Sequence, residues 1–301
     1  MIERVKQWSL LDWWFKPQDV RVTRVFEIFV CVCMVYYFSG YLKTPEWWLT
    51  EKGFHVSAAA TSSHYLAPPP LLPAEWVMPA VYSFYTLSGI YLLGYGRRIL
   101  NWVFFALCVY VQAMDQPSAF TINRMLIVYF FFLAVQPPEE TIDGKRVVSG
   151  WLVRVIQLTL VFQYLGAGIC KWYGGNWMDN VGGGVIDSMN YTIWSQAQGH
   201  YKNMISVWAL HTWPRFVWGG FAWATLTVET FAPILFFIRY KNIRLWALFA
   251  AFMMHVGIAV LMKDLIYFSF QMICTYVYFL PKHWVTIPVE KITEKLPLWR
   301  F

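Results

Sequence analysis

The sequence predicts an all-α fold: a polytopic membrane helix bundle of about eight transmembrane helices (six to eight), preceded by an amphipathic helix at the membrane interface. Composition is the first reason, because 58% of the 301 residues are hydrophobic and only 14% are charged. Soluble domains carry about 25% charged residues. The second reason is that the apolar residues gather in long runs. Lipid would cover the surface that charged residues cover in a soluble protein.

The predicted spans are eight apolar runs, several of which reach the ~20 residues that a spanning helix needs. They are Val22–Leu42, Trp76–Tyr95, Ile99–Val111, Met125–Val135, Val147–Cys170, Phe216–Ile238, Leu245–Met262 and Leu265–Leu280. The third and fourth runs are short and form either two spans or a re-entrant hairpin around Asp115. Two spans are favoured, because they let the topology close. We therefore place an interfacial segment at 1–21, the transmembrane domain at 22–281 and a cytoplasmic tail at 282–301.

Residues 2–16 precede the first run and have the composition of a helix lying in the headgroup plane. This segment combines the aromatic residues Trp8, Trp14 and Phe15 with the basic residues Arg4 and Lys6. Such a mixture is typical of interfacial helices. No cleavable signal pattern is recognised at this end.

The charges predict an orientation. The net charge is 24 − 17 = +7. With eight spans and a cytoplasmic N-terminus, 17 basic residues fall in inner segments and 7 in outer segments. This bias follows the positive-inside rule, so we expect a multi-pass protein of the cytoplasmic (inner) membrane with both termini in the cytoplasm. Lipids are then the expected partners, and the charge requires no nucleic acid.

Cysteine and motif patterns give little chemistry. Every cysteine lies in an apolar run without the spacing of a metal site, so we expect buried thiols and no bound metal. Cys170 is the exception to watch, because it adjoins Lys171. No Walker loop, dinucleotide glycine motif, serine triad or zinc motif is present.

Charged residues inside apolar runs are expensive and need a partner or a purpose. Arg24 and Glu27 are three residues apart and can pair on one helix face. Glu229 and His255 each lie in the middle of a run without a basic neighbour within a turn, so their partners must come from other helices. They line one functional polar cavity, make purely structural hydrogen bonds, or face lipid by accident.

The segment from Gln163 to Gly184 is the richest in unusual residues. Gly166 and Gly168 permit close helix packing. Lys171 follows at the predicted membrane edge, where a lysine either extends its amine to water or, in an apolar pocket, loses its proton and acts as a base.

Together these residues resemble the HTTM family, whose best-known member is the membrane part of vitamin K-dependent gamma-carboxylase. The resemblance covers about residues 10–281, and its most specific part is Tyr-x-x-Ala-Gly-x-x-Lys with a downstream tryptophan. The matching residues are Arg24, Asn123, Arg124, Tyr164, Ala167, Gly168, Lys171, Trp177, Glu229 and His255.

The resemblance implies an enzyme site for a quinone or hydroquinone cofactor. It assigns Lys171 as the base that starts oxidation, with Glu229 and His255 as further catalytic residues that place substrate or relay protons. The ligand-binding residues it implies are Tyr164, Trp177, Asn123 and Arg124.

The sequence also departs from the carboxylase. It stops just after the membrane part, and Leu100-Asn101 stands where the carboxylase has a histidine. We therefore do not expect gamma-carboxylation of glutamates. The short bacterial relatives match better in size, among them the sporulation-delaying protein B group, which takes part in maturing a peptide toxin.

Two functions remain open. The first is a membrane enzyme, oxidoreductase-like or carboxylase-like, acting on a quinone-like or lipidic molecule at the outer membrane face. The second is a non-catalytic subunit or maturation partner that contacts a peptide or other membrane subunits. A transporter is a weaker third, because no pair of repeats is seen.

Overall fold

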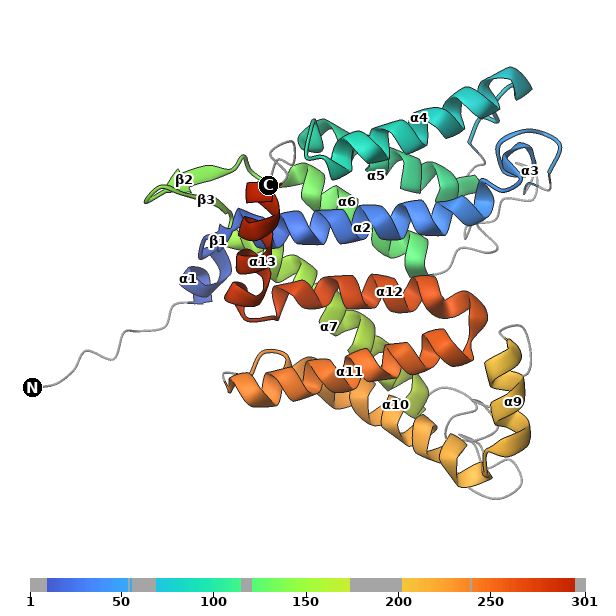
Figure 1. Cartoon of the computed structure of the whole chain (residues 1–301), viewed down its shortest axis with the longest axis vertical. Helices are drawn as coiled ribbons and strands as arrows, with labels where there is room; N and C mark the ends of the chain where they lie inside the picture. Colours follow the sequence, from blue (N-terminus) through green and yellow to red (C-terminus); the bar gives the residue numbers. More distant parts are fainter. Residues whose placement is uncertain are drawn as a thin grey trace, which may run out of the picture. The chain divides into compact units, whose positions relative to one another are not determined.

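The computed structural model describes residues 10–53, 55, 69–114, 121–173, 202–238 and 240–295. The chain forms two compact units. Unit 1 comprises Met1–Ile156 with Pro281–Phe301, and unit 2 comprises Gln157–Leu280. Each unit is mainly helical (Figure 1). The predicted domain boundaries concern the membrane and remain predictions.

Unit 1 is built on antiparallel and crossing helices. They are α1 (Leu10–Phe15), α2 (Val20–Tyr41), α3 (Pro45–Leu49), α4 (Ala74–Leu92), α5 (Arg97–Met114), α6 (Thr121–Val135), the first residues of α7 (Gly150–Tyr173), and α13 (Lys282–Lys295). Helix α2 contacts α4, α6 and α13, and α5 packs along α6. The core contains side chains without solvent exposure, such as Phe26, Leu126, Tyr129, Phe130 and Leu133.

A small antiparallel sheet lies at the start of α2 and was not predicted. Its strands are β1 (Gln18–Asp19), β2 (Glu140–Ile142) and β3 (Lys145–Val148), in the order β1-β3-β2. Asp143 and Gly144 form the two-residue turn between β2 and β3, both with positive φ. An Asp-Gly pair favours this hairpin turn, so the sequence did contain the signal for it.

Unit 2 holds the remainder of α7, α9 (Met204–Thr212), α10 (Arg215–Leu235), α11 (Lys241–Leu261), η2 (Lys263–Leu265), α12 (Ile266–Cys274) and η3 (Thr275–Tyr278). Its larger hydrophobic cluster joins α7, α10, α11, α12 and η3, with Ala232, Ala247 and Ala251 among its buried members. Small side chains let helices approach closely. Gln157 fastens α7 to η3, because its Nε2 donates to the carbonyl of Tyr278 at 2.8 Å.

Each of the eight predicted apolar runs contains a helix, which confirms the all-α prediction apart from the small sheet. The last run differs in detail, because it divides into η2, α12 and η3. Among the described residues, three helices are long and apolar enough to cross a membrane: Val20–Tyr41, Gly150–Tyr173 and Lys241–Leu261. A shorter apolar helix covers Ile122–Val135. Six to eight spans therefore remain a prediction.

The described part of the N-terminal segment contains the short helix α1, within the predicted amphipathic range of 2–16. Leu11 and Phe15 on this helix are exposed. Residues 1–9 lie outside the described residues. The contact of this segment with a membrane interface remains a prediction.

Candidate functional site

Lys171 and Glu229 form an ion pair in unit 2, with 2.5 Å between Nζ and Oε2. Lys171 lies in the last turn of α7, and Glu229 lies on α10. Their side chains are 21% and 10% exposed. This confirms that the partner of Glu229 comes from another helix. The pair neutralises two charges that would each be costly alone in apolar surroundings.

Gly168 brings α7 and α10 together next to this pair. A Cβ at Gly168 would lie 3.0 Å from Thr230 Oγ1 and 3.2 Å from the carbonyl carbon of Glu229. Any larger side chain would force the two helices apart. The prediction of close packing is thus confirmed for Gly168. The described residues show no such packing at Gly166, because none of their atoms would lie within 4 Å of a Cβ there.

The residue after Lys171 strengthens the same contact. Trp172 Nε1 donates to Thr230 Oγ1 at 2.9 Å, and Thr230 Oγ1 donates to the carbonyl of Leu226 at 2.7 Å. The rings of Trp172 and Trp223 lie edge to face. The hydrogen bond between Trp172 and Thr230 therefore joins α7 to α10 beside the pair, and the charge of Glu229 binds the lysine amine directly.

His255 belongs to a second buried polar set. Its Nε2 lies 2.7 Å from Tyr164 Oη, and Tyr164 Oη is hydrogen-bonded to Tyr276 Oη. These three residues come from α11, α7 and η3 and are at most 5% exposed. The rings of Tyr164 and Phe268 pack against the imidazole. His255 therefore has a hydrogen-bond partner from another helix, as the sequence required.

Helix α7 carries one member of each polar set. Tyr164 and Lys171 are seven residues apart, two helical turns, and so lie on the same face, roughly 10 Å apart along the axis. The described hydrogen bonds place Glu229 with Lys171 and His255 with Tyr164, as two sets along one helix face.

Several buried polar atoms of unit 2 have no hydrogen-bond partner among the described residues. They include Nδ1 of His255, Oγ of Ser269 and both amide atoms of Gln163. Gln163 precedes Tyr164 on α7, and Ser269 follows Phe268 on α12. Buried polar groups are normally hydrogen-bonded, so these atoms are able to bind a polar ligand or water.

The remaining predicted ligand-binding residues are Asn123, Arg124 and Trp177. Asn123 and Arg124 lie on α6 in unit 1. Asn123 is buried and donates to Gln112 Oε1 at 3.0 Å and to the carbonyl of Cys108 at 3.3 Å, whereas Arg124 is exposed. Asn123 thus ties α6 to α5. Trp177 lies outside the described residues.

In unit 1, the predicted pairing of Arg24 with Glu27 is confirmed, and it is part of a larger network. Glu27 Oε2 lies 3.1 Å from Arg24 and 2.8 Å from Arg97, and its side chain is fully buried. Arg97 also pairs with Glu139, and Glu139 pairs with Arg146. Arg97 and Glu139 belong to connections between runs, so their positions in sequence alone did not indicate this contact.

Further polar contacts complete the network. Arg24 Nη2 donates to the carbonyls of Tyr91 and Leu92 at 2.6 and 2.8 Å. The Tyr91 hydroxyl donates to Asn101 Oδ1 at 2.7 Å, and Asn101 Nδ2 donates to the carbonyl of Leu133 at 3.3 Å. Asn101 therefore connects α4, α5 and α6.

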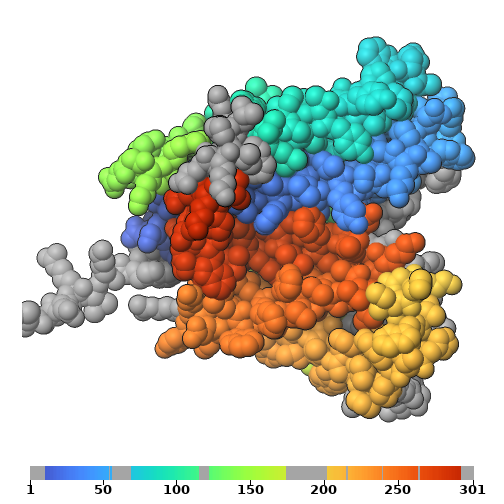
Figure 2. All heavy atoms as spheres, in the orientation of Figure 1, coloured from blue at the N-terminus to red at the C-terminus, as the bar shows by residue number. Residues whose placement is uncertain are grey.

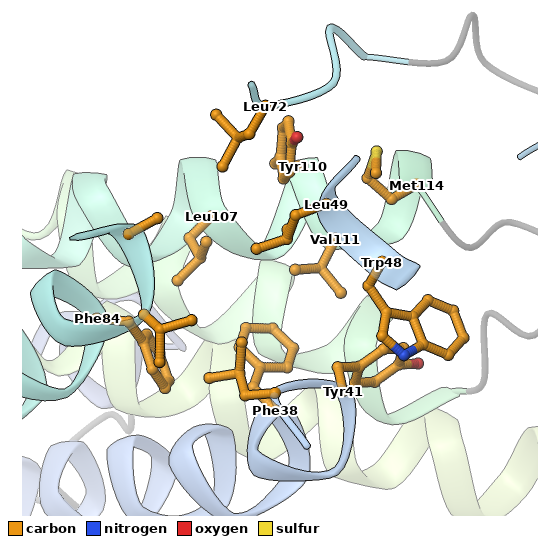
Figure 3. A pocket seen from close by; sticks show the side chains of 13 residues that line it. Phe38, Tyr41, Trp48, Leu49, Leu72, Phe84, Leu107, Tyr110, Val111 and Met114 are labelled. Atoms are coloured by element: carbon orange, nitrogen blue, oxygen red, sulfur yellow. The ribbon is translucent and has the colours of Figure 1, made fainter. Parts of the chain in front are cut away.

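Unit 1 also contains a small apolar cavity of about 110 Å³ (Figure 3). Its lining consists of Phe38, Tyr41, Leu42, Trp48, Leu49, Leu72, Ala80, Val81, Phe84, Leu107, Tyr110, Val111 and Met114. Sites for drug-sized molecules usually measure ~300–1,000 Å³, so this cavity is too small for a substituted ring. None of the predicted site residues lines it.

The cysteines behave largely as predicted. Cys31, Cys33, Cys108 and Cys274 are buried, and Cys170 is exposed. The expectation of burial is wrong for Cys170, because it lies in the last turn of α7 on a face that neighbouring helices do not cover.

Comparison of the chain with models of protein families, with curated proteins and with solved structures gives no match.

Proposed function

We propose that this chain is a multi-pass integral membrane protein of HTTM type whose unit 2 acts on a quinone-like or lipidic molecule. The ion pair between Lys171 and Glu229 carries this proposal, because it holds a titratable amine against a carboxylate between apolar helices. The cytoplasmic membrane, with both termini in the cytoplasm, is the proposed location. Three long apolar helices and the positive-inside bias support it.

The pair can supply a base through one proton transfer. When a proton moves from Nζ of Lys171 to Oε2 of Glu229, a neutral amine and a neutral carboxylic acid result. The short distance between the two atoms allows this transfer without rearrangement of the helices. The amine can then take a proton from an acidic hydroxyl of a substrate, while Glu229 holds the first proton.

The second polar set can hold or relay protons. The Tyr164 hydroxyl connects the His255 imidazole to the Tyr276 hydroxyl. Nδ1 of His255 has no hydrogen-bond partner among the described residues, so it can bind a group outside the set.

The residues present fit a ligand with polar oxygens. Buried atoms of Gln163, His255 and Ser269 lack described partners and could donate to or accept from such oxygens. A bound quinol would supply the acidic hydroxyl that gives its proton to the amine. Tyr164 and Trp177 remain proposed ligand contacts, as do Asn123 and Arg124 of unit 1.

The test is mass spectrometry of small molecules extracted from protein purified in mild detergent. Lys171→Ala leaves Glu229 without its partner and can destabilise the fold by about 3–5 kcal/mol. The decisive variant is therefore Lys171→Met combined with Glu229→Gln, which removes both charges and keeps similar side-chain volumes. We expect this double variant to keep the thermal stability of the wild type and to lose a co-purifying quinone or lipid.

Lys202→Met is the matched control, because Lys202 is an exposed lysine of unit 2. It should retain the bound molecule. If the double variant keeps both its stability and its ligand, the pair plays no part in binding and the enzyme proposal fails.

A second candidate is a non-catalytic subunit or maturation partner for a peptide or a larger membrane complex. The observation in its favour is that Lys171 and Glu229 already neutralise each other. Such a pair is stable without any ligand. This function predicts that Lys171→Arg, which keeps the charge, leaves co-purification of partner polypeptides unchanged, with no quinone in the extract.

A further inference from the structure

The apolar cavity of unit 1 lies where α3 packs against α4 (Figure 1, Figure 2). Its described walls come from the end of α2, from α3, from α4 and from the last turns of α5 (Figure 3). Most of the side chains that line it are partly exposed, so the cavity opens to the surface of unit 1. The function proposed for Lys171 and Glu229 leaves this cavity without a role.

Hydrogen bonds hold the walls of the cavity together. The backbone N–H of Leu72 donates to the carbonyl of Leu49 at 2.7 Å, which joins the segment before α4 to α3. The Tyr110 hydroxyl donates to the carbonyl of Pro70 at 3.0 Å, which joins the same segment to α5. These bonds fix the walls relative to one another, and small-molecule sites are usually preformed in this way.

The lining is suited to a ligand made of carbon and hydrogen. Almost the whole surface of the cavity is apolar. Both tyrosines of the lining bind other groups of the protein through their hydroxyls, because Tyr110 donates to Pro70 and the Tyr41 hydroxyl lies 3.0 Å from that of Tyr37. A buried water needs about two to four polar partners. The described lining therefore disfavours water and polar headgroups alike.

The volume selects among apolar ligands. The cavity measures about 110 Å³, whereas an engineered apolar cavity of about 150 Å³ holds a benzene molecule. A ring is therefore too large. An unbranched chain is the narrowest apolar part of a lipid, and it can extend through the open side of the cavity. Such a chain would give the wall side chains the dispersion contacts that an empty space denies them.

Hydrocarbon would reach the cavity from the surface of the same helices. Met78 on α4 is 47% exposed, and Val103 on α5 is 39% exposed. In the proposed membrane location, exposed apolar side chains of this kind contact the acyl chains of lipids, which are as apolar as leucine. The bilayer therefore supplies a ligand of the required chemistry at the mouth of the cavity.

We propose that the cavity between α2, α3, α4 and α5 binds a segment of an unbranched acyl chain of a membrane lipid. The chain fills the space between the four helices and holds that lipid beside α3. This inference rests on the proposed membrane location and not on the chemistry of unit 2.

The test is photocrosslinking of the full chain in lipid nanodiscs that contain phosphatidylcholine with a diazirine in one acyl chain. Mass spectrometry of peptide fragments locates the label, and in the wild type we expect it on Leu107 of the lining. Val111→Phe fills the cavity from α5, and Ala80→Leu fills it from α4. Each buried methylene contributes about fourfold to binding, so the exclusion of two methylenes should lower the labelling of Leu107 about 15-fold.

Val103→Phe is the matched control, because it makes the same substitution on α5 at an exposed position outside the cavity. It should keep the wild-type labelling of Leu107. Thermal unfolding shows which variants are folded, and the two filling variants lie on different helices, so loss of one fold leaves the other decisive. Labelling of Leu107 that stays unchanged in a folded filling variant would overturn the site.

Competition identifies the kind of chain. Excess hexadecanol, which is unbranched, should lower the labelling of Leu107. Farnesol is an isoprenoid alcohol with a branched chain, and it should compete less well. Stronger competition by farnesol would overturn the assignment to an acyl chain and favour an isoprenoid tail.

Phe162 on α7 separates this proposal from the membrane location, because it belongs to unit 2 and is 69% exposed. Label on Phe162 without label on Leu107 would overturn the acyl-chain site alone. Absence of label from both residues would overturn the membrane location and the site together. Neither result bears on the role of Lys171.

Discussion

In unit 1 the buried carboxylate of Glu27 meets two arginines, whereas in unit 2 the carboxylate of Glu229 meets a single lysine. The arginines of unit 1 extend the charge contacts through Glu139 to Arg146, whose side chain is 51% exposed. The pair in unit 2 is shorter and uses the amine, which loses a proton more readily than a guanidinium. The first network holds helices of unit 1 together, and the second is the pair to which the proposed function assigns proton transfer.

The largest expected effect comes from removing the centre of the unit 1 network. Glu27→Ala would leave Arg24 and Arg97 without their shared carboxylate in a fully buried position. Loss of one partner from a buried charge pair costs about 3–5 kcal/mol. Thermal unfolding in detergent should therefore show a strong loss of stability.

Arg146→Gln is the matched control, because it removes a charge at the exposed end of the same network. Exposed pairs contribute about 0–1 kcal/mol. If the two variants had similar stability, the network would not be the structural element that we infer.

The next effect concerns the helix contact behind the unit 2 pair. Gly168→Val would place side-chain atoms against Thr230 and the backbone of Glu229. Overpacking of this kind costs about 1–3 kcal/mol and should separate Lys171 from Glu229. Unfolding measurements on Gly166→Val provide the control, since no atom of the described residues lies within 4 Å of a Cβ at Gly166. Equal losses in both variants would argue against a specific contact at Gly168.

A smaller effect is expected from the shared tyrosine hydroxyl. Tyr164→Phe removes the partner of both His255 and Tyr276 and leaves these buried groups unsatisfied, at a cost of about 1–3 kcal/mol. Tyr276→Phe removes only the end of the set and should cost about 0.5–1.5 kcal/mol. Unfolding of both variants tests the order, and a more harmful Tyr276→Phe would contradict the central position of Tyr164.

The smallest effect is a pH dependence at the start of α2. Burial alone would raise the pKa of Asp19, but hydrogen bonds from Arg21 and the charges of Arg21 and Lys282 lower it below the usual value. The ionised carboxylate therefore stabilises the fold above about pH 4, the pKa of an unfolded aspartate. This stabilisation is lost as the pH falls through the lowered folded pKa.

Asp19→Asn isolates this charge, because asparagine is also a good N-cap. We expect the variant to be about 0.3–1 kcal/mol less stable than the wild type at neutral pH, with the difference closing in acid. Urea titrations at several pH values measure it. A difference that stays constant with pH would show that the carboxylate charge is not responsible.

The sequence predicted the positions of the helices and the need for particular contacts. Eight apolar runs gave eight helical regions, because hydrophobic length and the scarcity of charge are local properties. The Arg24–Glu27 pair was also predictable, since a spacing of three residues places two side chains on one helix face. The Asp143-Gly144 hairpin was missed, although its turn signal is local.

The partners of isolated charges could not be predicted in the same way. The sequence showed that Glu229 and His255 needed partners from other helices, but it did not show which ones. The structure pairs Glu229 with Lys171 and His255 with Tyr164. The resemblance grouped Asn123 with them, and this grouping remains a prediction; within unit 1, Asn123 donates to Gln112 and to the carbonyl of Cys108.

The sequence by itself determined that this protein is helical, apolar and obliged to pair its few buried charges, because these properties depend on composition and on short spacings. Only the tertiary structure decided that Lys171 meets Glu229 and that Arg97 joins Arg24 around Glu27. The physical reason is that such contacts depend on how helices cross. Crossing is set by side-chain shape at points such as Gly168 and Gly150, which lie far along the chain from the partners they bring together.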